Sequence, residues 1–170
     1  FDLENLFYRE EDIPAEFTLD EEIHQREFLS NGAMHPWTGK SSEVFSPICV
    51  KTKDGLVRKR IGSYPVCTEK ESMEALDAAV KAYDNGRGIW PTMSVADRIA
   101  CVEQFTQKMI AKRDIVVKLI MWEIGKSFAD SQKEFDRTVD YIYATIDALK
   151  DLDRDNSRFQ IEQGIIAQIR

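Results

Sequence analysis

The stretch Trp122-Glu123-Ile124-Gly125-Lys126, followed by Glu134-Phe135-Asp136-Arg137-Thr138-Val139, decides how this chain folds. Both stretches lie in a block from Thr68 to Asp153, in which apolar residues recur every three or four positions. That spacing places them on one face of a helix. The block covers about half of the 170 residues, so the segments before and after it must pack on these helices or leave them bare.

The first predicted helix of the block begins after Thr68. Thr68 and Glu71 have the spacing of a capping box, in which the two side chains bind the free amides at the start of a helix. Asn85-Gly86 is a typical helix end, because both residue types tolerate positive φ angles. Four apolar residues at helical spacing predict its buried face: Met73, Leu76, Val80 and Tyr83.

Three more helices are predicted after this one. Ser94 is the expected N-cap of the second helix, which should run to about Arg113. Asp114 is the expected N-cap of the third helix, and Gly125 its end. The third helix is apolar on most sides, so we expect it to be the most buried of the set. The fourth helix spans roughly residues 128–151.

The fourth helix has two distinct faces. Its buried face is predicted by apolar residues at helical spacing: Phe135, Val139, Ile142, Ile146 and Leu149. At 100° per residue Arg137 falls nearly opposite this stripe, together with Tyr141, Ala144 and Ala148. Two explanations of this second face stay open. Either another layer or a ligand covers it, or it is an exposed face that happens to carry small residues.

Two β-hairpins are predicted before the helical block. Asn31-Gly32 between short apolar runs is the strongest signal for a two-residue type I′ turn, which needs positive φ at both positions. Lys53-Asp54-Gly55 predicts a second hairpin between the apolar runs that flank it. Proline donates no ladder hydrogen bond, so three prolines should confine these strands to edges or short segments: Pro36, Pro47 and Pro65.

The two ends of the chain have different patterns. Residues 1–27 are acidic and weakly patterned, which predicts a solvated, extended arm with at most a short helical turn. From residue 154 onward the period drops to two, with Phe159 and Ile161 between polar residues, and this predicts a strand. The chain lacks an initiating Met and its strand pattern runs to the last residue, so we expect a piece of a longer protein.

Composition narrows the class of protein. With 43% hydrophobic and 31% charged residues, the chain is ordinary for a globular domain. Its net charge of −7 argues against a nucleic-acid surface, which needs clustered Lys and Arg to neutralise phosphates. No apolar run is long enough for a membrane span, and no signal-peptide pattern is present. We therefore expect a cytoplasmic protein that binds neither nucleic acid nor membrane.

Common catalytic patterns are missing from the sequence. It contains no phosphate-binding loop, dinucleotide fingerprint, zinc-protease helix or nucleophile elbow. Cys49, Cys67 and Cys101 are widely spaced without a Cys-x-x-Cys pair, which favours buried or inert reduced thiols over a disulfide or a zinc site. His24 and His35 lie outside the helical block, so a Cys–His nucleophilic pair would need distant segments to meet.

Charged residues around the opening stretch allow local ion pairs. Glu123 and Lys126 could act as an acid–base pair, but at this spacing a local ion pair is the default interpretation. Arg137 can pair with Glu134 or with Asp140, each about one helical turn away. A surface ion-pair network is therefore the default interpretation for Arg137 as well.

Taken together, four stretches resemble the N-terminal part of the aldehyde dehydrogenase superfamily. They are Phe28–Ala33 with Trp37, Ile61–Val66, Trp90–Arg98 and Glu123–Lys126. The resemblance covers about residues 28–170. It is greatest to the non-phosphorylating, NADP-dependent glyceraldehyde-3-phosphate dehydrogenases, through the segments Glu134–Ile142 and Gln163–Arg170.

This resemblance implies an α/β fold of the aldehyde dehydrogenase type. This chain would then be a mainly helical N-terminal segment with β-hairpins and a C-terminal strand. The implied parts are an acidic arm (1–27), a β-hairpin segment (28–67), the four-helix block of the cofactor-binding domain (68–153) and a strand of the oligomerisation arm (154–170).

The same resemblance implies a homo-oligomeric oxidoreductase that, at full length, oxidises glyceraldehyde 3-phosphate to 3-phosphoglycerate with NADP. The catalytic cysteine, the general-base glutamate and the cofactor site of the family match nothing in this chain, so we expect the chain alone to be inactive. One residue carries over. Arg137 matches an arginine that binds the C3 phosphate in the phosphate-substrate branch, a role that suits the planar guanidinium group.

Two other functions stay open at this point. The chain could be a non-catalytic helical module for protein association, or it could have a thiol-dependent activity of its own. A reading frame that continues past Arg170 into a catalytic cysteine would favour the dehydrogenase, whereas a stop codon would favour the association module. A thiol-dependent activity would require that alkylation of one of the three cysteines abolish turnover.

Overall fold

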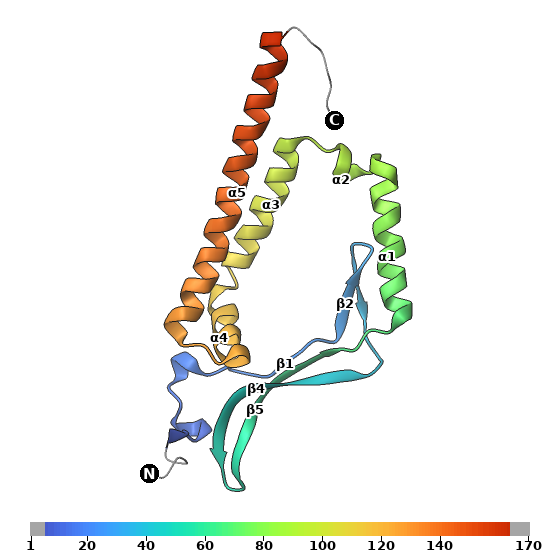
Figure 1. Cartoon of the computed structure of the whole chain (residues 1–170). Coiled ribbons are helices and arrows are strands. Elements are labelled where there is room, and N and C mark those ends of the chain that lie inside the picture. Colours follow the sequence, from blue (N-terminus) through green and yellow to red (C-terminus); the bar gives the residue numbers. More distant parts are fainter. Residues whose placement is uncertain (1–5, 164–170) are drawn as a thin grey trace.

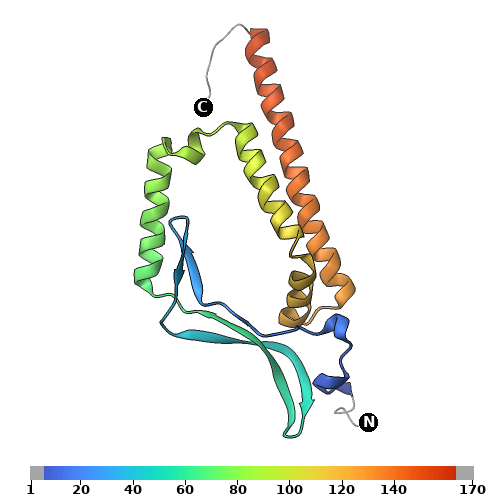
Figure 2. The same cartoon turned by 180° about the vertical axis from the view of Figure 1, so that it is seen from behind.

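The computed structural model describes residues 6–163 of the chain, with side chains up to residue 157. Its elements form a frame with two helical arms that are joined at both ends (Figure 1). One arm of the frame is the helix α1 (Glu69–Tyr83), and the other contains α3 (Val95–Ile110) beside the long helix α5 (Phe128–Gln163). A β-sheet joins the two arms at one end, and the short helix α2 (Ile89–Thr92) joins them at the other (Figure 2).

The larger sheet is built on the second predicted hairpin. Its strands β4 (Ser41–Thr52) and β5 (Gly55–Pro65) pair antiparallel, which confirms the hairpin, and β1 (Ile23–His24) joins β5 in parallel on the far side. Both hairpin strands are longer than expected. Pro47 fits within β4 because β4 is an edge strand and the pairing register shifts on either side of Phe45.

The first predicted hairpin is also confirmed. Strands β2 (Glu27–Ser30) and β3 (Ala33–Pro36) pair antiparallel around the Asn31-Gly32 turn. The φ angles of Asn31 and Gly32 are 50° and 74°, so both positions have the positive φ that a type I′ turn requires. The hairpin lies alongside α1 (Figure 1).

Helix α1 begins as predicted, but its apolar face is not buried. Thr68 and Glu71 form the capping box, with the Glu71 carboxylate accepting from the Thr68 amide at 2.7 Å. The four residues predicted to be buried are 49–63% exposed: Met73, Leu76, Val80 and Tyr83. That prediction was wrong for the described residues. Helical spacing identifies an apolar face, but whether the face is covered depends on which segments are present to cover it.

The boundaries of α3 and α4 differ slightly from the prediction. Ser94 caps α3 as expected, because its hydroxyl accepts from the Asp97 amide at 3.1 Å. Helix α3 ends at Ile110, a few residues early. Helix α4 (Arg113–Ile124) follows with Lys112 as its N-cap, so Asp114 lies inside the helix and is not the cap. Gly125 ends α4 in the left-handed conformation, as predicted.

Helix α4 contributes much of the core. Three of its residues are buried, namely Val117, Met121 and Trp122, which agrees with the expectation that this helix is the most buried. The hydrophobic cluster joins Met121 and Trp122 to Val50 of β4 and Ile61 of β5. The core therefore sits where α4 crosses the sheet, at the end of the frame that the sheet forms.

The N-terminal arm is more structured than the sequence indicates. It holds the short 3₁₀ helices η2 (Glu10–Asp12) and η3 (Ala15–Phe17) and the strand β1. Three of its apolar residues pack against the core cluster: Ile13, Phe17 and Leu19. The expectation of a solvated arm was therefore wrong for these residues, because scattered apolar side chains in an acidic segment were enough to dock it.

Helix α5 continues through the residues for which a strand was predicted. It is helical up to Gln163, so the strand expected around Phe159 and Ile161 is not formed. The segment contains no Gly or Pro between Phe128 and Gln163, and a helix satisfies its backbone hydrogen bonds within itself. A strand would need a neighbouring strand, which the described residues do not provide there. Residues 164–170 lie outside the described part, and the assignment of 154–170 to an oligomerisation arm stays a prediction.

Two ion pairs join the region around α4 to α5. The Arg113 guanidinium donates two hydrogen bonds to the Asp136 carboxylate, at 2.7 and 2.8 Å, and lies 6.0 Å from the centre of the Phe135 ring. The Lys126 ammonium, just after the end of α4, donates to the Glu134 carboxylate. These contacts fix the rotation of α5 about its own axis near its start.

We predict that Gly62→Ala loosens the N-terminal arm. A Cβ at Gly62 would overlap the carbonyl group of Ile23, which pairs with Gly62 across β1 and β5. The expected loss in the free energy of unfolding is about 2 to 4 kcal/mol, measured by chemical denaturation. Gly55→Ala is the control, because φ there is positive but no heavy atom lies within 4 Å, so only about 1 kcal/mol should be lost. Equal losses in the two variants would contradict the prediction.

We also predict that Asp136→Asn lowers the thermal stability of the protein at neutral pH but not in acid. The hydrogen bonds from Arg113 lower the pKa of the Asp136 carboxyl below its ordinary value. A group whose folded pKa is lowered stabilises the fold above its unfolded pKa, about 3.9, and loses that effect as the pH falls through the folded pKa. The difference in melting temperature between wild type and variant should therefore be largest near pH 7 and shrink below about pH 4.

The matched control for this prediction is Asp147→Asn. The Asp147 side chain is 76% exposed and lies 3.7 Å from the Lys150 ammonium on the same helix. Its loss should change the melting temperature less than Asp136→Asn at every pH, because exposed pairs within one helix contribute little. A pH-independent difference for Asp136→Asn would rule out the proposed role of the Arg113 pair.

Candidate functional site

Arg137, the one residue assigned a role from the sequence, lies on the exposed side of α5. The helix begins after Ser127, whose hydroxyl accepts from the Asp130 amide at 3.1 Å, and this hydroxyl also lowers the pKa of the Asp130 carboxyl by donating to it. Ser131 and Phe135 are buried on the other side of the helix, at 0% and 4% exposure. Their burial turns Arg137 outward, as the helical spacing predicts.

The acidic neighbours of Arg137 are bound to other cations. Asp136 is held by Arg113, and Glu134 by Lys126. Within residues 6–157, no carboxylate lies within 4.0 Å of the Arg137 guanidinium, so neither of the two predicted pairings, with Glu134 or with Asp140, is formed. The guanidinium is therefore exposed and without a carboxylate partner in this part of the chain.

The acid–base pair considered for Glu123 and Lys126 is also absent. Lys126 turns toward Glu134 on α5 instead, because Gly125 ends α4 in a left-handed turn and redirects the chain. The Lys126 side chain is 39% exposed and that of Glu134 is 33% exposed. Their pair thus contributes to joining the two helices and has no link to Glu123.

A groove of about 530 Å³ lies between α3 and α5, beside Arg137. Arg137 itself does not line it, but the next residue, Thr138, does. Apolar side chains dominate the lining, which consists of Trp90, Arg98, Ile99, Val102, Thr138, Tyr141, Ile142, Thr145, Ile146 and Leu149. Tyr141 is 66% exposed, so the described residues leave uncovered the second face of α5, on which Tyr141 lies. Trp90 of α2, at the edge of the groove, is 50% exposed. Ala144 and Ala148 are also exposed.

Arg98 is the groove residue that sequence reasoning missed. It lies on α3 directly before Ile99, which is buried, and its Nε atom is buried without a hydrogen-bond partner. The available signal was a cation directly before an apolar residue, Ile99, within a predicted helix. Because the sequence offers many surface arginines, that signal did not distinguish Arg98 before the packing was known.

The three thiols are free, as expected, but they are not buried. Cys67 and Cys101 are exposed and Cys49 is half-buried, so of the two alternatives, buried or inert thiols, burial does not hold, and inertness stays a prediction. The histidines contact other groups: His35 lies 3.2 Å from the Ser30 carbonyl oxygen and His24 contacts Ser63. Among the described residues no cysteine is hydrogen-bonded to a histidine, so the geometry gives no support to a Cys–His nucleophile. No group of three or more potential metal ligands gathers in this part either.

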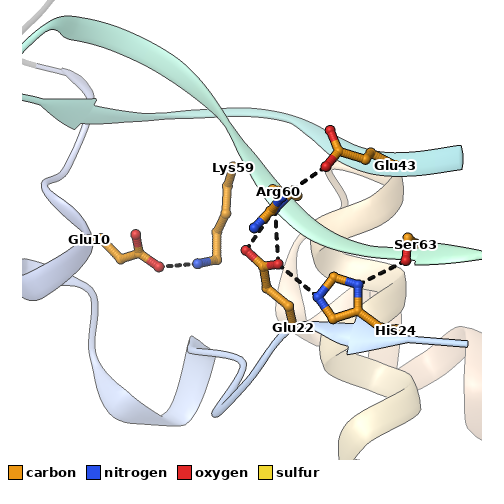
Figure 3. Close-up of polar contacts among 7 residues, drawn as sticks. All are labelled: Glu10, Glu22, His24, Glu43, Lys59, Arg60 and Ser63. Carbon is orange, nitrogen blue, oxygen red and sulfur yellow. Dashed lines mark hydrogen bonds and ion pairs between the residues drawn. The ribbon is translucent and has the colours of Figure 1, made fainter. Parts of the chain in front are cut away.

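A row of polar residues joins the N-terminal arm to the larger sheet (Figure 3). The His24 ring lies 2.8 Å from the Ser63 hydroxyl through Nδ1 and 3.1 Å from the Glu22 carboxylate through Nε2. Arg60 donates to the same carboxylate at 3.0 Å and to Glu43 at 2.8 Å. The Lys59 ammonium contacts Glu10, further along the arm (Figure 3).

This row is a structural tie, although a Ser–His–Glu sequence of contacts suggests a nucleophile. The pKa of Glu22 is lowered, mainly by the hydrogen bond from Arg60. The negative charge of this carboxylate is therefore already balanced by the Arg60 guanidinium. The serine hydroxyl can donate to a neutral His24 or accept from a protonated one, so both charge states of the ring are satisfied. The described arrangement therefore joins β1 to β5 and does not activate Ser63.

No helix in the described part of the chain is long and apolar enough to cross a membrane.

Comparison with known proteins identifies the fold. A solved structure of an NAD-dependent aldehyde dehydrogenase from Sinorhizobium meliloti is similar, with a TM-score of 0.66 and 20% sequence identity. The similarity covers 82% of this chain and 26% of that chain, so the present chain spans about a quarter of the dehydrogenase it matches. No curated protein matches the chain.

The family model of the aldehyde dehydrogenases matches residues 41–169 of the chain. The match includes both hairpin strands of the larger sheet and every α-helix, and it agrees with the resemblance seen in the sequence. The predicted fold, an N-terminal segment of the aldehyde dehydrogenase type, is confirmed. Because the matched region is well over half of the chain, the chain belongs to the aldehyde dehydrogenase family.

Proposed function

We propose that this chain is the N-terminal part of a longer oxidoreductase that oxidises an aldehyde to an acid with a nicotinamide cofactor. The observation that carries the proposal is the family match over residues 41–169, taken with the small share of the S. meliloti dehydrogenase that the chain covers. A cytoplasmic homo-oligomer is part of this proposal. It is compatible with the net charge of −7 and with the apolar surface left exposed on α1.

The proposed substrate is glyceraldehyde 3-phosphate, oxidised to 3-phosphoglycerate with NADP. Arg137 would bind the C3 phosphate. Its side chain is exposed on α5 next to the groove, and its acidic neighbours Asp136 and Glu134 are held by Arg113 and Lys126. A guanidinium without a carboxylate partner is suited to bind a phosphate through two parallel hydrogen bonds.

The described residues do not themselves fit a dinucleotide. The lining of the α3–α5 groove is mostly apolar and offers a single cation, Arg98, whereas a pyrophosphate needs several amides or cations converging on it. When bound, the nicotinamide would accept the hydride from the aldehyde carbon. We assign that step to residues outside this chain, and we propose that the chain alone is inactive.

We predict that, in the complete enzyme, Arg137→Ala selectively weakens use of the phosphorylated aldehyde. Loss of a charge-assisted phosphate contact should raise KM for glyceraldehyde 3-phosphate roughly 10- to 100-fold. The KM for an unphosphorylated aldehyde of similar size should change less than about twofold, because that aldehyde makes no contact with the guanidinium. Steady-state kinetics with both substrates measures the difference.

The control for Arg137→Ala is Lys133→Ala on the same face of α5. The Lys133 side chain is 79% exposed, so its removal takes away one surface charge at a nearby position without removing a guanidinium fork. Both KM values should stay within about twofold of wild type if long-range attraction is weak at physiological salt. Equal increases for both aldehydes in Arg137→Ala would exclude a phosphate-binding role.

The alternative function is a helical module for protein association. The exposed apolar stripe on α1, which includes Leu76 and Val80, favours it, because such a surface commonly mediates binding. The dehydrogenase proposal explains the same stripe as a surface covered by further polypeptide of the enzyme.

The mass of the natural protein distinguishes these two functions. An antibody raised against this chain, used on an extract of its source cells, should detect a species much heavier than 19.6 kDa if the chain is part of a dehydrogenase. A species of 19.6 kDa and nothing heavier would contradict that proposal and favour the association module.

A further inference from the structure

Glu134 is the carboxylate best placed to occupy the Arg137 guanidinium. The two residues lie three positions apart on α5, and side chains at this spacing are neighbours on the surface of a helix. The acidic residue precedes the basic one, which is the more favourable order for a pair within a helix. An ion pair between Glu134 and Arg137 is therefore the arrangement that helical spacing favours, yet the described residues do not form it.

The cation that occupies Glu134 is Lys126, which lies outside α5. Its ammonium group donates to the Glu134 carboxylate, because Gly125 ends α4 with a φ angle of 77° and redirects the chain. The side chains of this pair are 39% and 33% exposed, compared with 79% and 58% for the pair of Lys133 and Asp130 on α5. Because a less exposed pair is screened less by water and salt, Lys126 competes strongly for this carboxylate.

The other two acidic neighbours of Arg137 compete less for its guanidinium. Asp136 directly precedes Arg137, so it lies about 100° away around the helix, and Arg113 already donates two hydrogen bonds to its carboxylate. Asp140 follows Arg137 by three positions, which is the less favourable order, and its side chain is shorter than that of glutamate. Glu134 is therefore the competitor that must be held away if Arg137 is to bind an anion.

We propose that Lys126 is a positioning residue of the phosphate site: by holding Glu134, it keeps that carboxylate from occupying Arg137 and so sets the affinity for the phosphorylated aldehyde. This inference rests on the proposed function, in which Arg137 binds the phosphate. Loss of the Lys126 charge has two effects in the same direction. The Glu134 carboxylate becomes available to pair with Arg137, and its unbalanced negative charge repels the phosphate.

The first test is Lys126→Met in the complete enzyme, which removes the ammonium group and keeps an unbranched side chain. The quantity measured is the ratio of KM for glyceraldehyde 3-phosphate to KM for an unphosphorylated aldehyde of similar size. We expect this ratio to rise about three- to tenfold, the change that one unbalanced charge close to the phosphate produces. If Lys126→Met fails to fold, Lys126→Gln, which keeps a hydrogen bond but not the cation, should give a smaller rise.

The second test removes the carboxylate as well. In Lys126→Met/Glu134→Gln no carboxylate remains at this position to compete for Arg137, so the KM ratio should return to within about twofold of wild type. The melting temperature should stay lowered, because the ion pair between α4 and α5 is still absent. A purely structural role for Lys126 predicts the opposite result, in which the double variant is as impaired as Lys126→Met.

The matched control is Lys133→Met on α5. It removes an ammonium group and releases Asp130, which lies 3.6 Å from it. Asp130 precedes Arg137 by seven positions, about 10 Å along the helix axis, and this distance exceeds the screening length of about 8 Å at physiological salt. The KM ratio of Lys133→Met should therefore stay within about twofold of wild type.

Two outcomes would overturn the inference. One is an unchanged KM ratio in the folded Lys126 variant, which includes an equal rise of both KM values. The other is a raised ratio that Glu134→Gln does not restore. These failures differ from a failure of the proposed function, which Arg137→Ala tests by itself. A phosphate-selective effect of Arg137→Ala beside an unchanged ratio in Lys126→Met leaves the phosphate site standing and removes only the role of Lys126.

Discussion

The packing of Trp122 is the interaction on which the rest of the structure depends. Its side chain is 4% exposed in the core cluster and its indole Nε1 donates to the Phe17 carbonyl at 2.7 Å. The buried Ser46 hydroxyl of β4 donates to the Trp122 carbonyl oxygen, and the Lys59 ammonium lies 5.6 Å from the ring centre. One residue of α4 thereby holds the N-terminal arm, the larger sheet and the helices of the α3–α5 side of the frame together.

Local signals in the sequence were sufficient wherever a few neighbouring residues determine the structure. The capping box at Thr68, the Asn31-Gly32 turn and the glycine end of α4 at Gly125 all formed as predicted. Each depends on hydrogen bonds or φ angles within about four residues. The family resemblance succeeded for a related reason, since several short stretches in the right order are a strong constraint on topology.

Predictions failed where the outcome depends on partners that are distant or lie outside the described residues. The apolar stripe of α1 is exposed because no described segment packs on it, and the strand near Phe159 is replaced by helix because no neighbouring strand is described there. In the candidate site, the outward position of Arg137 followed from helical spacing. The burial of the Arg98 Nε atom did not, because it requires the packing of α3 against α5.

Besides its side-chain contacts, the arm is held through its backbone at two points, and this bears on how its sequence can diverge. The Phe17 carbonyl accepts from Trp122, and the Tyr8 carbonyl accepts from the Lys51 amide at 2.9 Å. Every residue type supplies a carbonyl oxygen, so these two contacts select the path of the arm without specifying the side chain at either position. Divergence of the arm is therefore limited by the side chains that pack on the core cluster, and not by these two backbone contacts.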